Sequence, residues 1–163
     1  MSTKLPKQSK IVIIGGGIMG CSTAYHLLKN GCRDVILLER TKLTSGTTWH
    51  SAAQVRQLRS TESLTRLVQN SVALYSSLEA ETGQATGWKQ TGSLSIATNP
   101  DRLTHIRRQA SLSLAFGIGA EEISVSNAAE KWPLMRSDDL IGAVYSPSDG
   151  RVSPSDICAA LIK

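Results

Sequence analysis

The stretch Lys10 to Glu39 reads KIVIIGGGIMGCSTAYHLLKNGCRDVILLE and decides the fold of this chain. An apolar, β-branched run over 11–14 predicts a strand that is buried on both faces. A glycine-rich turn follows, and the next segment predicts a helix to about Asn30, with Gly31 at the C′ position. The apolar run 35–38 predicts a second buried strand that ends at Glu39. This order of elements is the βαβ unit that opens a doubly wound α/β sheet.

The segment 15–20 matches the pattern G-x-G-x-x-G, and each glycine of the pattern has a physical reason. Gly15 permits the tight turn, Gly17 lets the backbone approach a pyrophosphate, and Gly20 lets the helix press against the sheet. Glu39 follows Gly20 by nineteen residues and is placed to accept both hydroxyls of an adenosine ribose. Its charge disfavours the 2′-phosphate of NADP. The unit therefore predicts dinucleotide binding, but it does not separate FAD from NAD.

Composition and length exclude several classes of protein. With 163 residues, 40% of them hydrophobic and 19% charged, we expect a globular protein with one hydrophobic core rather than two. No apolar run is long enough for a membrane span. The polar tail 1–10 resembles neither a secretory signal nor a mitochondrial presequence, so we expect a cytoplasmic protein. Three cysteines without C-x-x-C spacing argue against a metal site, and scattered basic residues with 4% aromatics argue against a nucleic-acid partner.

A hydroxyl-rich loop, Thr41 to Thr48, follows Glu39-Arg40 and leads into Trp49-His50-Ser51. Turn chemistry alone would explain such a composition. Its position directly after the candidate ribose carboxylate favours a loop that serves the phosphates or a ring edge of the cofactor.

The remainder of the chain alternates between predicted helices and strands. We expect helices from Ser60 to Gly83, from Asn99 to near Gly117, at 127–132 and from Ser153, and strands at 93–98, 123–125 and 140–145. The side chains expected to face inward are Leu64, Leu67, Val68, Tyr75, Leu78, Leu94, Ile96, Leu103, Ile106, Leu114, Ile157, Ala160 and Leu161. The helix capped by Ser153 stops at Lys163, and a doubly wound sheet needs more than two parallel strands. We therefore expect the chain to be truncated.

Several segments together resemble the start of the flavin-dependent sarcosine and dimethylglycine dehydrogenases, in the D-amino-acid oxidase-like superfamily. The similarity covers 10–163, and its most specific element is the sequence S-G-T-T-W-H at 45–50. The other segments that carry it are 11–39, 79–83, 86–88, 92–94, 97–98, 132–134, 148–150 and 153–154.

The resemblance implies that 11–163 is the N-terminal portion of an FAD-dependent oxidoreductase domain. Its fold would be a Rossmann-like FAD-binding α/β domain with part of an inserted α+β substrate domain, to which 84–145 would contribute. The activity implied is oxidation of an N-methylated glycine, such as sarcosine or dimethylglycine, by hydride transfer from the N-methyl carbon to the flavin. Full members usually continue into a tetrahydrofolate-binding module. Nothing in this chain corresponds to that module, and the electron acceptor is not indicated.

The resemblance also assigns cofactor-binding residues, but no catalytic residue. It implies that His50 carries FAD covalently at the 8α position. The other positions implied to contact FAD are Gly15, Gly17, Gly20, Glu39, Arg40, Ser45, Gly46, Thr47 and Thr48. The sequence departs from the usual pattern after His50, where S-A-A-Q occupies 51–54 and two arginines, Arg56 and Arg59, follow. The exact amine substrate is therefore left open.

Two alternatives to a covalent flavoprotein remain. One is a non-covalent FAD or NAD oxidoreductase on the same scaffold, in which His50 is incidental. The other is a truncated dinucleotide-binding fragment without catalytic activity. Yellow colour that survives acid precipitation would select the covalent form, and colour released to the supernatant would select the non-covalent one.

Overall fold

The computed structural model describes residues 6–163, so the first five residues of the predicted polar tail lie outside the described part. The chain forms two compact units. Unit 1 is Met1–Ala53, Leu74–Trp88 and Val152–Lys163, and unit 2 is Gln54–Ala73 and Lys89–Arg151. Each unit has its own cluster of buried side chains. The prediction of a single core is therefore wrong, because the inserted segments of unit 2 form a sheet with a separate core.

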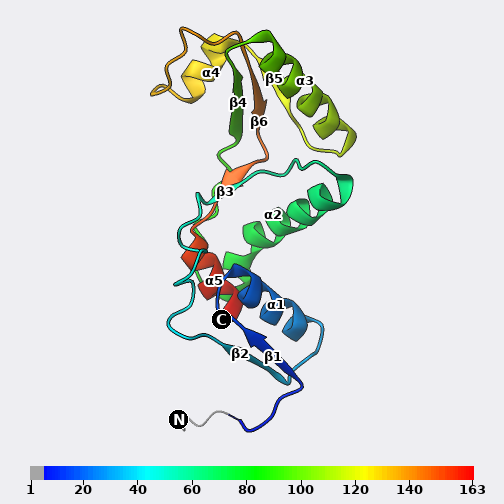
Figure 1. Ribbon diagram of the computed structural model, residues 1–163, viewed down its shortest axis with the longest axis vertical. Coiled ribbons are helices and arrows are strands. Elements are labelled where there is room, and N and C mark those ends of the chain that lie inside the picture. The colour runs from blue at the N-terminus through cyan, green and yellow to red at the C-terminus, as the bar shows by residue number, and fades with distance from the viewer. Residues whose placement is uncertain (1–5) are drawn as a thin grey trace. The chain divides into compact units, whose positions relative to one another are not determined.

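Unit 1 opens with the predicted strand–turn–helix–strand unit (Figure 1). Strands β1 (Ile11–Ile14) and β2 (Val35–Leu38) pair in parallel, and helix α1 (Ile18–Lys29) connects them. Gly15 has φ +109° and Gly31 has φ +85°, so both positions use backbone conformations that favour glycine. The βαβ unit predicted from the sequence is confirmed.

The core of unit 1 forms where α1 packs against α5 (Pro154–Ile162) (Figure 1). Its buried members are Cys21, Tyr25, Leu78, Ile157, Cys158, Ala160 and Leu161. Burial, and to a smaller extent the neighbouring Cys21, raise the pKa of Cys158 to about 12, so this thiol stays neutral. The inward face predicted for the last helix is confirmed. Ser153 is the N-cap residue, as predicted, but its side chain makes no capping hydrogen bond; its backbone N–H donates to the Thr86 carbonyl at 3.1 Å.

One face of the parallel pair remains open to water. Val12 is 50% exposed and Ile14 is 87% exposed, although the sequence predicts burial on both faces. Helix α1 covers the other face, where Ile13 lies below Gly20. Among residues 6–163 the sheet has only β1 and β2, and the segment 6–9 lines a shallow pocket with Val12 but leaves it half exposed. Leu28 in α1 is also 52% exposed.

Helix α2 (Glu62–Thr82) crosses from unit 2 into unit 1. It starts after Thr61, whose hydroxyl accepts the Leu64 N–H at 3.3 Å, and it ends at Gly83 with φ +66°. The predicted apolar stripe is wrong in its first half, where Leu64 is 47% exposed and Leu67 is 60% exposed. The buried residue of that half is Thr65, whose hydroxyl donates to the Thr61 carbonyl at 2.8 Å. Thr65, with its hydroxyl hydrogen-bonded, therefore occupies the buried face of this half of α2 instead of the expected leucines. No helix among residues 6–163 is both long and apolar enough to cross a membrane.

Unit 2 is built on an antiparallel sheet of order β4-β6-β5, covered on one face by α3 (Figure 1). The bounds are β4 Ser93–Ala97, α3 Pro100–Ala115, β5 Glu121–Ile123, α4 Val125–Lys131 and β6 Gly142–Ser146. Asn99 caps α3 by accepting the Arg102 N–H at 2.9 Å. A second antiparallel pair, β3 (Gln54–Val55) with β7 (Gly150–Arg151), is absent from the sequence-based expectations. Leu114, expected to face inward, is 63% exposed.

The alternation predicted for β4 is present, but the inward face is the opposite one. Ser93, Ser95 and Ala97 are buried, whereas Ile96 is 36% exposed. The reason is tertiary, since both serine hydroxyls have partners in other segments of unit 2. A serine with a hydrogen-bond partner can be buried at little cost, and the expectation that Leu94 and Ile96 face the core is therefore wrong.

Candidate functional site

The first candidate site is the glycine turn at the carboxyl ends of β1 and β2. Gly16 is its most enclosed residue: its N–H donates to Glu39 Oε2 at 2.7 Å and its carbonyl accepts the Thr44 N–H at 2.9 Å. A Cβ at this position would lie 2.6 Å from Leu43 Cδ2. It would also lie 3.0 Å from Glu39 Cβ, so a larger residue here would have to displace the Leu43 side chain, at a position that the G-x-G-x-x-G pattern leaves unspecified.

Gly17 and Gly20 are required for different steric reasons. A Cβ on Gly17 would lie 2.9 Å from the Thr48 hydroxyl oxygen. A Cβ on Gly20 would overlap the carbonyl oxygen of Gly15 and would contact Ile13 Cγ2 at 3.4 Å. Gly20 therefore permits the close approach of α1 to β1, as the pattern predicts, and Gly17 permits the approach of the 41–48 loop.

The first turn of α1 presents unpaired backbone donors. Ile18 N–H donates to the Thr48 hydroxyl at 3.0 Å, so one of the donors expected for a phosphate is already used within the chain. The N–H groups of Gly17, Met19 and Gly20 have no acceptor anywhere in residues 6–163. Free N–H groups and the positive end of a helix dipole suit an anion. This donor set fits the pyrophosphate of a dinucleotide.

Glu39 lies beside the turn and is tied to it. Its carboxylate accepts the Thr41 N–H at 2.9 Å as well as the Gly16 N–H. These backbone donors, Thr41 first and Gly16 second, lower the pKa of Glu39, so the group is ionised at neutral pH. A carboxylate offers about four acceptor positions, so room remains for ribose hydroxyls. The sequence alone pointed only to the ribose, and the structure adds a bond that joins the end of β2 to the turn.

The hydroxyl-rich loop touches the turn at two of its residues. Thr44, with φ +67°, donates its N–H to the Gly16 carbonyl, and Thr48 lies at the helix N-terminus as described. The Thr44 hydroxyl also lies 3.2 Å from that of Ser155 in α5. The predicted cofactor residues that are exposed and make no hydrogen bond to the described residues of the turn are Arg40, Ser45, Gly46 and Thr47. The structure therefore brings only part of the predicted set together.

His50 is exposed and lies next to the exposed indole of Trp49. Their ring centroids are 4.0 Å apart and their planes meet at 62°. Within residues 6–163 the His50 ring makes no hydrogen bond. Only Trp49 separates it from Thr48, so its Cα lies within about 7 Å of the anchored Thr48 Cα. Connectivity, rather than a side-chain contact, keeps His50 near the turn.

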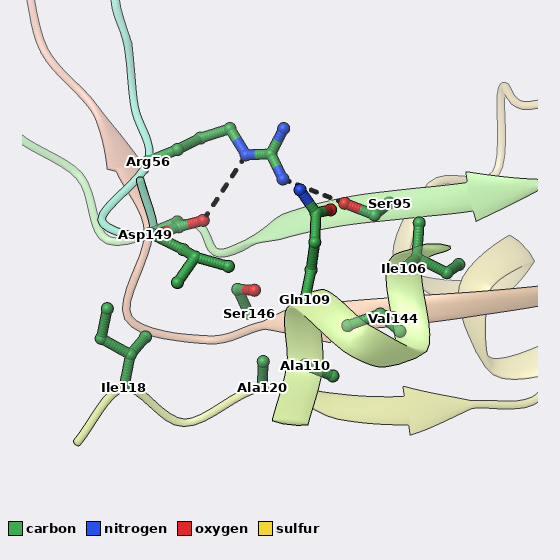
Figure 2. A pocket seen from close by; sticks show the side chains of 11 residues that line it. Arg56, Ser95, Ile106, Gln109, Ala110, Ile118, Ala120, Val144, Ser146 and Asp149 are labelled. Atoms are coloured by element: carbon green, nitrogen blue, oxygen red, sulfur yellow. Dashed lines mark hydrogen bonds and ion pairs between the residues drawn. The ribbon is translucent and has the colours of Figure 1, made fainter. Parts of the chain in front are cut away.

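A second polar cluster, centred on Asp149 in unit 2, was missed by the sequence reasoning. Asp149 is only 3% exposed and accepts the Gln57 N–H at 2.9 Å and the Ser93 hydroxyl at 2.6 Å. Figure 2 shows the Arg56 side chain between Asp149, 4.0 Å away, and the Ser95 hydroxyl, to which it donates at 3.0 Å. The only sequence signal was the segment S-D-G at 148–150, which carries no indication of these partners.

The cavity beside Arg56 is too small for a substrate. Its volume is about 20 Å³, and Ile106, Gln109 and Val144 complete its walls (Figure 2). Such a volume accommodates about one water molecule. The cluster therefore fixes the segments of unit 2 to one another and does not form a ligand pocket.

Comparison with known proteins places this geometry among flavin enzymes. Residues 10–163 match the family described as "FAD dependent oxidoreductase". Sarcosine dehydrogenase of Mus musculus, a mitochondrial protein, is 44% identical over 163 residues, which is 99% of this chain and 18% of that protein. Dimethylglycine dehydrogenases are also among its relatives. The chain thus spans about one fifth of the length of the curated relatives it matches.

Two further similarities widen the comparison. The regulatory subunit of the mitochondrial pyruvate dehydrogenase phosphatase of Mus musculus is 43% identical over 160 residues, or 98% of this chain and 18% of that protein. The crystal structure of L-proline dehydrogenase from P. horikoshii superimposes with a TM-score of 0.88 at 31% identity, over 97% of this chain and 41% of that one. Similar sequences of this length thus occur both in dehydrogenases and in a protein named for regulation.

Proposed function

The chain belongs to the FAD-dependent oxidoreductase family, and on that premise we propose that it supplies the FAD-binding turn of an enzyme that oxidises a small N-methylated amino acid. The observation that carries the proposal is the set of unpaired N–H groups at Gly17, Met19 and Gly20, beside the ionised Glu39. The resemblance to sarcosine and dimethylglycine dehydrogenases and the FAD-binding α/β fold expected from it are confirmed.

In this proposal each part of the turn has one task. The free N–H groups bind the pyrophosphate, and the remaining acceptor positions of Glu39 bind the ribose hydroxyls. Arg40, Ser45, Gly46 and Thr47 are exposed on the adjoining loop and complete the cofactor contacts. FAD, when bound, supplies the hydride acceptor.

We further propose that His50 is the residue to which FAD is covalently attached. Three features support this assignment. The imidazole is exposed, it makes no hydrogen bond within residues 6–163, and the anchored Thr48 keeps its backbone close to the turn. A free imidazole nitrogen is available as a nucleophile.

The proposed substrate is supported by the names of the relatives, and the proposed substrate domain is supported by the structure of unit 2. The name of the mouse relative, sarcosine dehydrogenase, supports a small N-methyl amino acid as substrate. The separate core of unit 2 supports a contribution of 84–145 to a substrate domain. The resemblance also supports a tetrahydrofolate-binding module in a longer form of the protein. The cytoplasmic location stays a prediction from the composition of 1–10, and the relatives named above are mitochondrial proteins.

A regulatory protein without oxidoreductase activity is the second candidate. The observation that favours it is the similarity to the phosphatase regulatory subunit, at 43% identity, whereas the family match and the sarcosine and dimethylglycine dehydrogenases favour the oxidoreductase. A non-covalent flavoprotein is the third candidate, in which the turn binds FAD and His50 has no role in attachment.

Flavin retention by the purified chain tests the proposal. We expect the chain to retain FAD through gel filtration, and Glu39→Gln to weaken binding by about tenfold through loss of a charge-assisted hydrogen bond. Glu121→Gln, at an exposed position in β5, is the matched control and should bind like the wild type. Tight binding of NADP, or no flavin binding, would contradict the proposal.

Acid precipitation then tests the attachment. In a protein that contains the whole catalytic unit, we expect the tryptic peptide with His50 to carry the flavin mass. His50→Ala should still bind FAD but release it on denaturation. An unmodified His50 peptide from a yellow protein would leave the non-covalent candidate.

A further inference from the structure

Unit 2 contains a second, larger pocket, which we call the Trp132 pocket. Its volume is about 570 Å³, against about 20 Å³ for the cavity beside Arg56. Pockets that hold small molecules usually span about 300–1,000 Å³. The Trp132 pocket is lined by Gln54, Thr91, Gly92, Ser93, Leu94, Lys131, Trp132, Tyr145 and Arg151.

The charged groups of this pocket are all positive. Lys131 and Arg151 are the two charged residues that line it, and no aspartate or glutamate does. Neither side chain forms an ion pair with any residue in 6–163. Two uncompensated cations around one cavity raise the local concentration of anions.

The walls also present two aromatic rings. Trp132, directly after α4, is 56% exposed, which is unusual for so large an apolar side chain. Lys131 Nζ lies 3.9 Å from the centroid of the Tyr145 ring, a cation–π distance. The Tyr145 ring lies directly against the backbone of Gly92. Gly92 has φ +71°, and a Cβ at this position would overlap the ring.

Polar donors in the pocket are available to a ligand. The Tyr145 hydroxyl, the Trp132 indole N–H and the Gln54 side-chain amide have no hydrogen-bond partner among the residues that the structure describes. The Tyr145 ring and Leu94 come from paired positions on β6 and β4, so they share one face of the sheet. The pocket thus combines cations, ring faces and free donors in one place.

We propose that the Trp132 pocket binds a small aromatic carboxylate. Arg151 and Lys131, the latter from its place over the Tyr145 ring, hold the carboxylate, and the ring of the ligand packs against the exposed indole of Trp132. A simple inorganic anion would use the cations but would leave the indole facing water, and a neutral aromatic would leave the two charges without a partner. All residues that line this pocket belong to unit 2, whereas the glycine turn belongs to unit 1, and the proposal does not depend on the proposed flavin chemistry.

Titration of the ¹⁵N-labelled chain with phenylacetate tests the site. The chain has three tryptophans, so the indole N–H signal of Trp132 is assigned from its loss in Trp132→Phe. We expect a saturable shift of that signal with phenylacetate. Acetate has the charge without the ring, and phenylacetamide has the ring without the charge. Each should bind at least about tenfold more weakly, because each lacks one of the two interactions.

Charge-neutralising variants sharpen the test. Arg151→Gln and Lys131→Gln should each weaken phenylacetate binding by about tenfold. Arg108→Gln removes the same charge from an exposed position of α3 outside the pocket and should bind like the wild type. Dispersed amide spectra will show that each variant is folded. The proposal is overturned if acetate binds as well as phenylacetate, if the Trp132 signal does not shift saturably, or if both pocket variants bind normally.

Discussion

The glycine turn of unit 1 and the Asp149 cluster of unit 2 both gather donors around one carboxylate, yet they differ in almost every other respect. At the turn, Glu39 accepts from Gly16, 23 positions earlier, and neighbouring N–H groups have no acceptor in residues 6–163. In unit 2, Asp149 accepts from Gln57, 92 positions earlier, and from Ser93, 56 positions earlier, and it is buried. The local cluster is open and can receive a ligand, whereas the long-range cluster is closed and holds the fold together.

If the Asp149 cluster holds unit 2 together, a substitution that breaks it should have the largest effect on stability. Asp149→Ala leaves the Gln57 N–H and the Ser93 hydroxyl buried without an acceptor and removes the partner of Arg56. We expect a loss of about 3 kcal/mol in the free energy of unfolding, at the lower end for a buried pair because Arg56 is partly exposed. Urea denaturation measures it.

Asp138→Ala is the control for that experiment. Asp138 pairs with Arg136 on the surface, and both side chains are mostly exposed. This substitution should leave the urea midpoint unchanged, since exposed ion pairs contribute little. Equal effects of the two aspartate substitutions would contradict the distinction between a closed and an open cluster.

The glycine turn of unit 1 also contains one tightly packed contact, which lies between α1 and β1 at Gly20. Gly20→Ala places a methyl group on the Gly15 carbonyl, so the helix must move away from the strand. We expect a loss of about 2 kcal/mol, typical of overpacking, together with loss of flavin binding. Gly119→Ala, where the nearest atom would lie at 3.9 Å, should be neutral in thermal unfolding and flavin retention. A Gly20→Ala protein as stable as the wild type would show that the helix is free to shift.

A smaller effect should follow from removing the hydroxyl that satisfies the first N–H of α1. Thr48→Val keeps the shape of the side chain but removes the acceptor of the Ile18 N–H. We expect a loss of about 1 kcal/mol, as for other helix N-terminal caps. Thr47→Val changes an exposed neighbour that makes no side-chain hydrogen bond in the described part of the chain, and it should be neutral. Identical melting temperatures for the two variants would remove Thr48 from this role.

The smallest effect concerns the pH dependence contributed by Glu39. The pKa of Glu39 is lowered in the folded state, chiefly by the Thr41 N–H and then by the Gly16 N–H. A lowered folded-state pKa means that the contribution is present above the unfolded value, about 4.3, and is lost as the pH falls through the folded value. The difference in urea midpoint between wild type and Glu39→Gln should therefore shrink on acidification from pH 6 to pH 3. A difference that stays constant with pH would show that the carboxylate charge is not involved.

Sequence reasoning succeeded where neighbours in space are also neighbours in the chain. The βαβ unit, the turn at Gly15 and the helix that begins after Asn99 follow from local periodicity and backbone sterics. It failed for the inward face of β4, the first half of α2 and the number of cores. In β4 the buried serines have partners in distant segments. In α2 the buried position is taken by Thr65, whose hydroxyl is satisfied by the Thr61 carbonyl. The second core arises because the inserted segments form a sheet of their own.

Distance along the chain also separates what the sequence by itself determined from what only the tertiary structure decided. The sequence determined the strand–turn–helix–strand unit, the need for glycine at 15 and 20 and the acidic group after β2, because these depend on backbone sterics within about thirty residues. Only the tertiary structure decided that Gly16 is enclosed, that Thr48 uses one helix donor, and that Asp149 joins Arg56, Gln57 and Ser93. Those contacts join segments whose separation along the chain leaves no local pattern, since a hydrogen bond depends on where its two atoms lie in space.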